Sequence, residues 1–160
     1  MLDEKIKNYL TELGFNSKQI STIVNTKPLS ELTKENMFFH IASVSVCLIE
    51  LGYSKKDIVK MVIKTPNLFS HSTAILKEKF EYLLSLGYSV EQIKKLTKNQ
   101  PAMYNYNIKN INEKIDNMTN LGYSHEEVLK MGLSFSGIYS LSTNAIKNRI
   151  NNFLSMGYTM

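Results

Sequence analysis

Lysines that recur at fixed intervals are the side chains of this sequence whose type and spacing best suit a chemical task. Two sets of three are spaced by 35 residues: Lys60, Lys95 and Lys130, called here the outer ladder, and Lys79, Lys114 and Arg149, called the flanking ladder. Cations repeated at a constant interval can contact a polyanion whose charges also repeat, such as a nucleic-acid backbone. Both ladders are therefore candidate nucleic-acid contacts.

Other site chemistry is not expected. His40, His71 and His125 fall at unrelated places and lack partners at metal-ligand spacing, which argues against a metal site. Cys47 lies in an apolar stretch with no histidine at a motif spacing, so it is not a candidate nucleophile. Residues 132–137 (GLSFSG) begin like a phosphate loop but continue with Ile-Tyr instead of Lys-Ser/Thr. We expect no enzymatic activity and no cofactor.

The composition is that of a folded intracellular protein. A chain of 160 residues with 43% hydrophobic and 21% charged residues suits one globular domain or a short repeat array. No apolar run approaches the roughly 18 residues of a membrane-spanning helix. The single cysteine excludes a disulfide framework, and the early acids resemble no secretory signal, so we expect a cytoplasmic protein. The net charge of +5 permits a polyanionic partner.

A tandem repeat positions the ladders. The tripeptide Leu-Gly-aromatic, or Met-Gly-Tyr in its last copy, recurs with its glycine at Gly14, Gly52, Gly87, Gly122 and Gly157. The intervals are 38, 35, 35 and 35 residues. Fourteen residues after the first three glycines stands a proline, at Pro28, Pro66 and Pro101, and Ser136 takes that place in the fourth repeat. Such a period decides the architecture before local propensity does.

Each repeat is predicted to be a helical hairpin. The glycine ends one helix, and a short polar residue with a carboxylate or amide three positions later begins the next. These pairs are Asn16 and Gln19, Ser54 and Asp57, Ser89 and Gln92, and Ser124 and Glu127. The proline ends this first helix, and a longer second helix follows a small apolar cluster. No segment alternates with period two, so the fold class is all-α, with about four 35-residue hairpins stacked as a solenoid.

The expected organisation is a single helical-repeat domain over residues 1–160. A partial leading repeat (1–13) precedes repeats at 14–51, 52–86, 87–121 and 122–156, and 157–160 begins another. Repeat one has three extra residues, expected between Pro28 and Phe38. Its second helix, from Phe38 to Ile49, is apolar nearly all round. Either the leading helix and repeat two cover it, or it contacts a partner protein or a second copy of the chain.

The pattern Leu-Gly-Tyr-Ser, an isoleucine four residues later, a proline after the first helix and leucine-type positions along the second resembles the mitochondrial transcription termination factor (mTERF) family. The resemblance covers Leu13 to Tyr158, and residues 66–69 (PNLF) and 101–104 (PAMY) match best. It implies repeats of two α-helices and a 3₁₀ turn, coiled into a superhelix whose positive inner path binds nucleic acid. The richness in Lys, Asn and Ile is typical of an AT-rich bacterial genome and indicates a bacterial member.

Charge is distributed unevenly among the repeats. Residues 1–52 carry −1, and the three segments 53–87, 88–122 and 123–157 carry +3, +2 and +1. Helical periodicity places the outer ladder on a solvated face and the flanking ladder beside the packed face. The alternative is that duplication has copied ordinary surface lysines. Tyr53, Tyr88 and Tyr123 could stack on bases, but their position before the cap favours a hydrophobic staple.

The sequence thus predicts a non-catalytic module that binds nucleic acid, with duplex DNA favoured over RNA, and that regulates transcription. The single arginine, Arg149, argues against sequence-specific base reading. With about six phosphate contacts, the affinity should fall by about a hundredfold or more as the salt concentration rises from 50 to 200 mM. The alternative is a protein-binding scaffold of the α-solenoid type.

Overall fold

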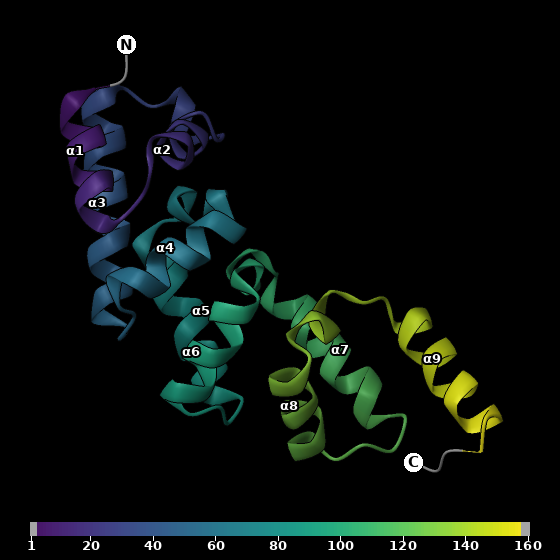
Figure 1. The fold of residues 1–160 in the computed structure, drawn as a ribbon. Helices are drawn as coiled ribbons and strands as arrows, with labels where there is room; N and C mark the ends of the chain where they lie inside the picture. The colour runs from purple at the N-terminus through teal and green to yellow at the C-terminus, as the bar shows by residue number, and fades with distance from the viewer. Residues whose placement is uncertain (1–2, 158–160) are drawn as a thin grey trace. The chain divides into compact units, whose positions relative to one another are not determined.

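The computed structural model of this chain describes residues 3–157, and within them it contains nine α-helices, four 3₁₀ helices and no strand (Figure 1). The predicted all-α class is confirmed. The α-helices are α1 (Glu4–Leu13), α2 (Ser17–Val24), α3 (Lys34–Glu50), α4 (Lys55–Lys64), α5 (Thr73–Ser85), α6 (Val90–Asn99), α7 (Ile108–Thr119), α8 (His125–Ser134) and α9 (Thr143–Ser155). The expectation for Tyr158 to Met160 falls outside the described residues.

The recurring glycine closes each second helix in a left-handed conformation. Its φ lies between 88° and 111° at all five positions, a region that residues with a Cβ rarely adopt. The N–H of the following aromatic residue donates to the carbonyl five residues back, as Tyr53 does to Leu48 at 3.0 Å. This is the hydrogen bond of a Schellman motif, and it satisfies a carbonyl that the helix end leaves unpaired.

All four predicted capping boxes form at the starts of α2, α4, α6 and α8. At α2, the Asn16 side chain accepts from the Gln19 N–H, while the Gln19 side chain accepts from the Asn16 N–H. Asn16–Gln19 and Ser54–Asp57 depart from the Ser-x-x-Glu/Gln consensus, yet they pair in the same way. The start of each first helix is therefore fixed by residues local in sequence.

A 3₁₀ helix follows each first helix, as the family resemblance implied: η1 (Leu29–Glu31), η2 (Pro66–Ser70), η3 (Pro101–Asn105) and η4 (Ser136–Ser140). Proline occupies the first position of η2 and η3, where its missing N–H leaves no bond unmade. The apolar pair after the proline points inward, because Leu68, Phe69, Met103 and Tyr104 are all buried. η2 and η3 each pack on the first helix of their own repeat and on the second helix of the preceding repeat.

The three extra residues of repeat one lengthen its second helix. α3 has 17 residues where α5 has 13, and it begins at Lys34, within the interval expected for the insertion. The chain from Pro28 to the start of α3 is no longer than that from Pro66 to the start of α5. The insertion therefore adds about one turn of helix, at 3.6 residues per turn, and no loop.

The described chain divides into two compact units, one ending at Tyr106 and the other beginning at Asn107. The division falls inside the third predicted repeat, between η3 and α7. In the first unit the helices form two layers. The first helices α2, α4 and α6 make one layer, and the second helices α1, α3 and α5 make the other. In the second unit α7 packs on α8, and α8 on η4.

The apolar helix α3 is largely covered from within the chain. Met37, Ile41 and Leu48 are buried, and α3 contacts α1, α5 and η2. The Tyr9 ring of α1 meets Phe38 edge to face, with ring centres 5.7 Å apart. The leading helix and repeat two thus provide the predicted cover.

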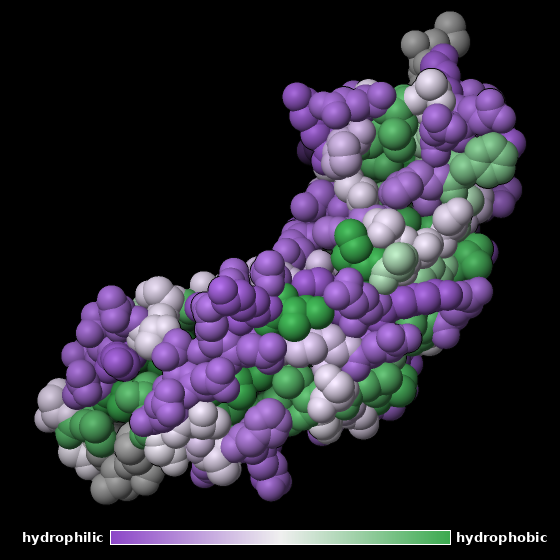
Figure 2. Space-filling view, turned by 180° about the vertical axis from the view of Figure 1, so that it is seen from behind, coloured by the Kyte–Doolittle hydropathy of each residue, from purple (hydrophilic) through white to green (hydrophobic). Residues whose placement is uncertain are grey.

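The opposite side of α3 exposes three large apolar residues among polar ones such as Asn36 and Ser43. Phe39, Val46 and Ile49 are 55%, 51% and 46% exposed. Hydrophilic residues cover most of the face shown in Figure 2, and apolar residues reach it only in separate patches. An exposed apolar strip along one helix is a feature that interaction surfaces share.

A buried hydroxyl chain ties repeat two to repeat three. The Tyr53 hydroxyl lies 2.7 Å from the Thr97 hydroxyl and 2.9 Å from that of Tyr104. Because Thr97 gives its own proton to the Ile93 carbonyl, Tyr53 must donate to Thr97, and Tyr104 must donate to Tyr53. Burial raises the pKa of both tyrosines, so both remain donors at neutral pH.

We predict that Tyr53→Phe lowers the free energy of unfolding by about 1–3 kcal/mol, because it leaves the buried Tyr104 hydroxyl without its acceptor. Tyr104→Phe should also destabilise, and the double variant should cost less than the sum of the single variants, since the two hydroxyls share one bond. Urea unfolding followed by circular dichroism measures all three. Strictly additive losses would show that the hydroxyl chain is not a unit.

Candidate nucleic-acid interface

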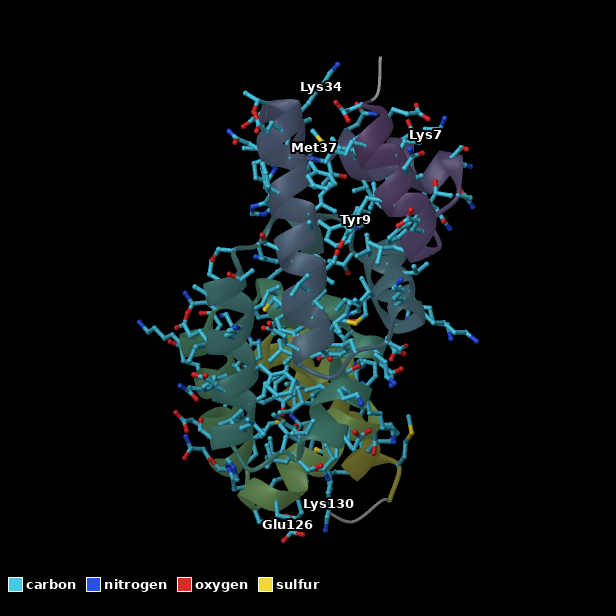
Figure 3. All side chains as sticks on the ribbon, turned by 90° about the vertical axis from the view of Figure 1, so that its left-hand side faces the viewer. Lys7, Tyr9, Lys34, Met37, Glu126 and Lys130 are labelled. Carbon is cyan, nitrogen blue, oxygen red and sulfur yellow. The ribbon has the colours of Figure 1, made fainter. Side chains whose placement is uncertain are left out.

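The outer ladder is exposed at every position. Lys60 on α4 and Lys95 on α6 lie on adjacent first helices of the first unit, and their side chains face solvent. Lys130, on α8 in the second unit, is also exposed, and its ammonium pairs with Glu126 at 2.8 Å (Figure 3). The hydrogen bond and charge of Glu126 raise the pKa of Lys130, and those of Lys130 lower the pKa of Glu126. Lys60 and Lys95 are therefore the members of the outer ladder whose ammonium groups are least engaged by other side chains.

Two members of the flanking ladder, Lys79 and Lys114, have a structural role. The Lys79 ammonium on α5 donates to the carbonyl of Tyr106, and the Lys114 ammonium on α7 donates to the carbonyl of Leu141. Tyr106 and Leu141 are equivalent residues that end η3 and η4. Each bond therefore joins a second helix to the 3₁₀ helix of the next repeat, once in each unit.

Burial agrees with this assignment. Lys79 and Lys114 are half-buried, and desolvation lowers the pKa of Lys79 despite the nearby Glu78. The equivalent residue of repeat one is Val44, which is buried. At Lys79 and Lys114 the ammonium serves a carbonyl of the next repeat, a role that sequence spacing alone does not reveal. Arg149 is exposed and remains a candidate contact.

Lysines concentrate on one layer of the first unit. The first helices α2, α4 and α6 carry eight lysines and two acids, Asp57 and Glu91. The second helices α1, α3 and α5 carry five lysines and six acids. Lys18, Lys55, Lys56, Lys64, Lys94 and Lys98 belong to this basic layer and were not singled out as candidate contacts. Counting charge by helix instead of by repeat would have found them.

A groove between α4 and α6 gathers three of these lysines: Lys60, Lys64 and Lys98. Lys64 reaches across it and donates to the Lys98 carbonyl at 3.0 Å and to the Asn99 carbonyl at 3.3 Å. These are the last carbonyls of α6, where the helix dipole favours a cation. Lys60 also lines the groove and is exposed, so its ammonium is available to an anion.

The one carboxylate in the groove is already engaged. The Asp57 Oδ1 lies 3.5 Å from the Lys98 ammonium, and its Oδ2 accepts from the Ser54 hydroxyl at 2.8 Å. Burial alone would raise the pKa of Asp57, but the hydrogen bonds from Ser54 and the charge of Lys98 bring it below its ordinary value. Asp57 is therefore ionised at neutral pH and balances one lysine, which leaves the groove positive.

Two of the three candidate stacking tyrosines are not accessible to bases. Tyr53 and Tyr88 are 2% and 3% exposed, and Tyr123 is half-buried. Their rings fill the core behind the helix cap, which agrees with the staple interpretation. Within the described part of the chain, no three side chains of His, Cys, Asp or Glu converge as metal ligands would.

These features belong to a known class of repeat protein. The mTERF family model matches residues 2–159, and the chain therefore belongs to the mTERF family. A search of curated proteins gives no match. Of the helices within residues 3–157, none is both long and apolar enough to cross a bilayer.

We predict that Lys79→Met and Lys114→Met each lower the free energy of unfolding by about 1 kcal/mol, because each removes a charged donor from a carbonyl of the next repeat. Lys60→Met is the matched control, since its ammonium faces solvent, and it should leave stability nearly unchanged. Equal urea midpoints for Lys60→Met and Lys79→Met would contradict the structural role of the flanking ladder.

Proposed function

We propose that this chain binds nucleic acid through the basic layer of α2, α4 and α6 and catalyses no reaction on it. The single observation that carries the proposal is the separation of charge between the two layers: eight lysines and two acids on one, five lysines and six acids on the other. A surface of one sign attracts a polyanion at long range and holds it by displacing its counterions.

The proposed contacts are backbone phosphates. Lys60 and Lys95 present exposed ammonium groups on neighbouring helices, and Lys130 and Arg149 are exposed in the second unit. Lysine acts as a point charge, and the guanidinium fork that reads guanine is scarce in this chain. Binding should therefore depend little on base sequence. We favour duplex DNA over RNA as the ligand, and a role in regulating transcription, as the resemblance to the family suggests. The location that we propose, from the composition of the chain, is the cytoplasm.

A second candidate function, a protein-binding scaffold, is favoured by the exposed strip Phe39, Val46 and Ile49 on α3. A protein partner or a second copy of the chain could cover it. Nucleic-acid binding ranks first, because the strip lies on one helix whereas the basic layer extends over three.

We predict salt-sensitive binding of duplex DNA that depends on the basic layer. Fluorescence anisotropy with labelled duplex DNA, duplex RNA and single strands should show affinity falling steeply between 50 and 200 mM salt, with a slope of about −0.9 per phosphate contact on duplex DNA. The double variant Lys60→Glu/Lys95→Glu should weaken binding at least about tenfold at low salt and flatten this slope.

The control is Lys7→Glu/Lys34→Glu, which makes the same change of charge on α1 and α3 of the other layer. It should alter the affinity far less than the first pair. If the two double variants lost the same amount of affinity, binding would depend only on the net charge of the chain. The absence of any binding at 50 mM salt would rule out the proposed function.

A further inference from the structure

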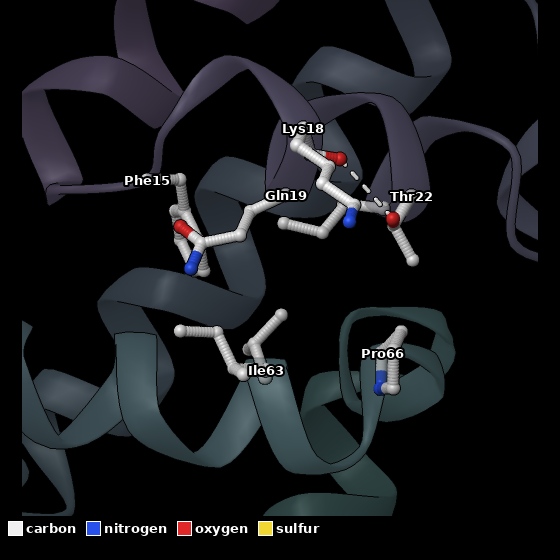
Figure 4. Close-up of a pocket in the computed structure, with 8 residues that line it drawn as sticks. Phe15, Lys18, Gln19, Thr22, Ile63 and Pro66 are labelled. Carbon is white, nitrogen blue, oxygen red and sulfur yellow. Dashed lines mark hydrogen bonds between the residues drawn. The ribbon is translucent and has the colours of Figure 1, made fainter.

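The groove between α2 and α4 is apolar although it lies within the basic layer (Figure 4). Its floor is made by buried residues, among them Ile23 and Val62, and its open side by Ile63 and Pro66. Ile63 is 48% exposed and lies on a helix that also carries four lysines. The groove encloses about 150 Å³, so it has room for roughly five waters or one large side chain.

This groove and the α4–α6 groove are the same feature in successive repeats. Thr22, eight residues after its glycine, lines the first groove, and the equivalent Lys60 lines the second. On the facing helix Ile63 stands where the next repeat has Lys98. The same architecture therefore presents an apolar slot at one position and a cationic slot at the next.

The two grooves share a wall. Ile63 lines both of them, whereas Lys60 and Lys64 line only the cationic one. Neighbouring packed helices are about 8–10 Å apart, so an apolar group in one groove and an anionic group in the other would lie about one helix diameter from each other. A single ligand that lies across α4 can fill both.

The charges around the apolar groove select an anionic ligand. Its rim carries Lys18, and α2 contains no acid. The one acid of α4, Asp57, is paired with Lys98. A ligand with carboxylates beside its apolar group would meet complementary charge, and a cationic one would be repelled.

The lining favours a protein side chain over a nucleobase. Bases bind to exposed aromatic faces, and the one aromatic residue of the groove, Phe15, is only 3% exposed with its ring edge against Phe69. Ile63 and Pro66 offer aliphatic surface, which suits a leucine or phenylalanine anchor. We propose that the α2–α4 groove docks an acidic segment of a partner protein, with an apolar anchor in the groove and carboxylates on Lys18, Lys60 and Lys64.

This inference does not rest on the proposed nucleic-acid binding, because the groove that carries it is apolar. The two ligands would nevertheless share Lys60 and Lys64, so they would compete. An acidic partner would then displace nucleic acid from the first unit.

The test uses the full chain and a fluorescein-labelled acidic peptide with one central leucine, followed by anisotropy. The decisive variant is Ile63→Lys, which copies the residue that repeat three has at this place and should therefore fold normally. If the anchor occupies the groove, Ile63→Lys weakens peptide binding by about tenfold or more although it adds a positive charge. Replacing the leucine of the peptide by serine should cause a similar loss.

Leu84→Lys on α5 is the matched control, since Leu84 is an exposed apolar residue of the other layer, at 40% against 48% for Ile63, and the charge change is the same. It should leave peptide binding unchanged, and thermal unfolding checks that both variants are folded. Duplex DNA should bind Ile63→Lys at least as tightly as the parent chain, which separates this inference from the proposed function.

Three results would overturn the inference. The first is that the peptide fails to bind at 50 mM salt. The second is that it binds Ile63→Lys as tightly as the parent chain, as a purely electrostatic contact would. The third is that a single-stranded oligonucleotide, and not the peptide, loses affinity on Ile63→Lys, which would identify the groove as a base-binding site.

Discussion

The turn at the left-handed glycine is the constraint on which the rest of this structure depends. Within a few residues it ends a second helix, buries an aromatic ring and caps the next first helix. The helix end and the cap satisfy backbone groups that would otherwise be left unpaired, and the ring adds apolar burial. Because the same turn occurs at a nearly constant interval, first helices face first helices and second helices face second helices in the unit that ends at Tyr106.

Layering gives the sequence a simple way to separate charge. A residue at a given distance from its glycine belongs to the same layer in each repeat, so lysines at a few recurrent positions accumulate on one side. The inter-helix groove recurs as well, and its chemistry changes with single residues such as Thr22 and Lys60 or Ile63 and Lys98. A repeat fold can thus hold neighbouring sites of opposite character on one backbone frame.

Much of the fold could be predicted from the sequence, because its determinants are local. Glycine, the capping pairs and the proline act on residues near them, and the structure has each where the spacing places it. The candidate site was harder to predict, because the role of a lysine depends on atoms that are far from it in the sequence. Lys79 and Lys60 both recur every 35 residues, yet one meets a carbonyl of the next repeat and the other meets solvent. The net charge of a whole repeat also combines a first helix with a second helix, so it does not reveal the basic layer.

The lysines that bind carbonyls, Lys79 and Lys114, affect how cooperatively the repeats unfold. In stacked repeats each repeat contacts only its neighbours, and the cooperativity of unfolding depends on how strongly adjacent repeats are coupled. A bond from a second helix to the 3₁₀ helix of the next hairpin, as from Lys79 to Tyr106 and from Lys114 to Leu141, is such a coupling. A hairpin that frays has to release its neighbour's ammonium into water, so the bond raises the free energy of local opening and strengthens the coupling between adjacent hairpins.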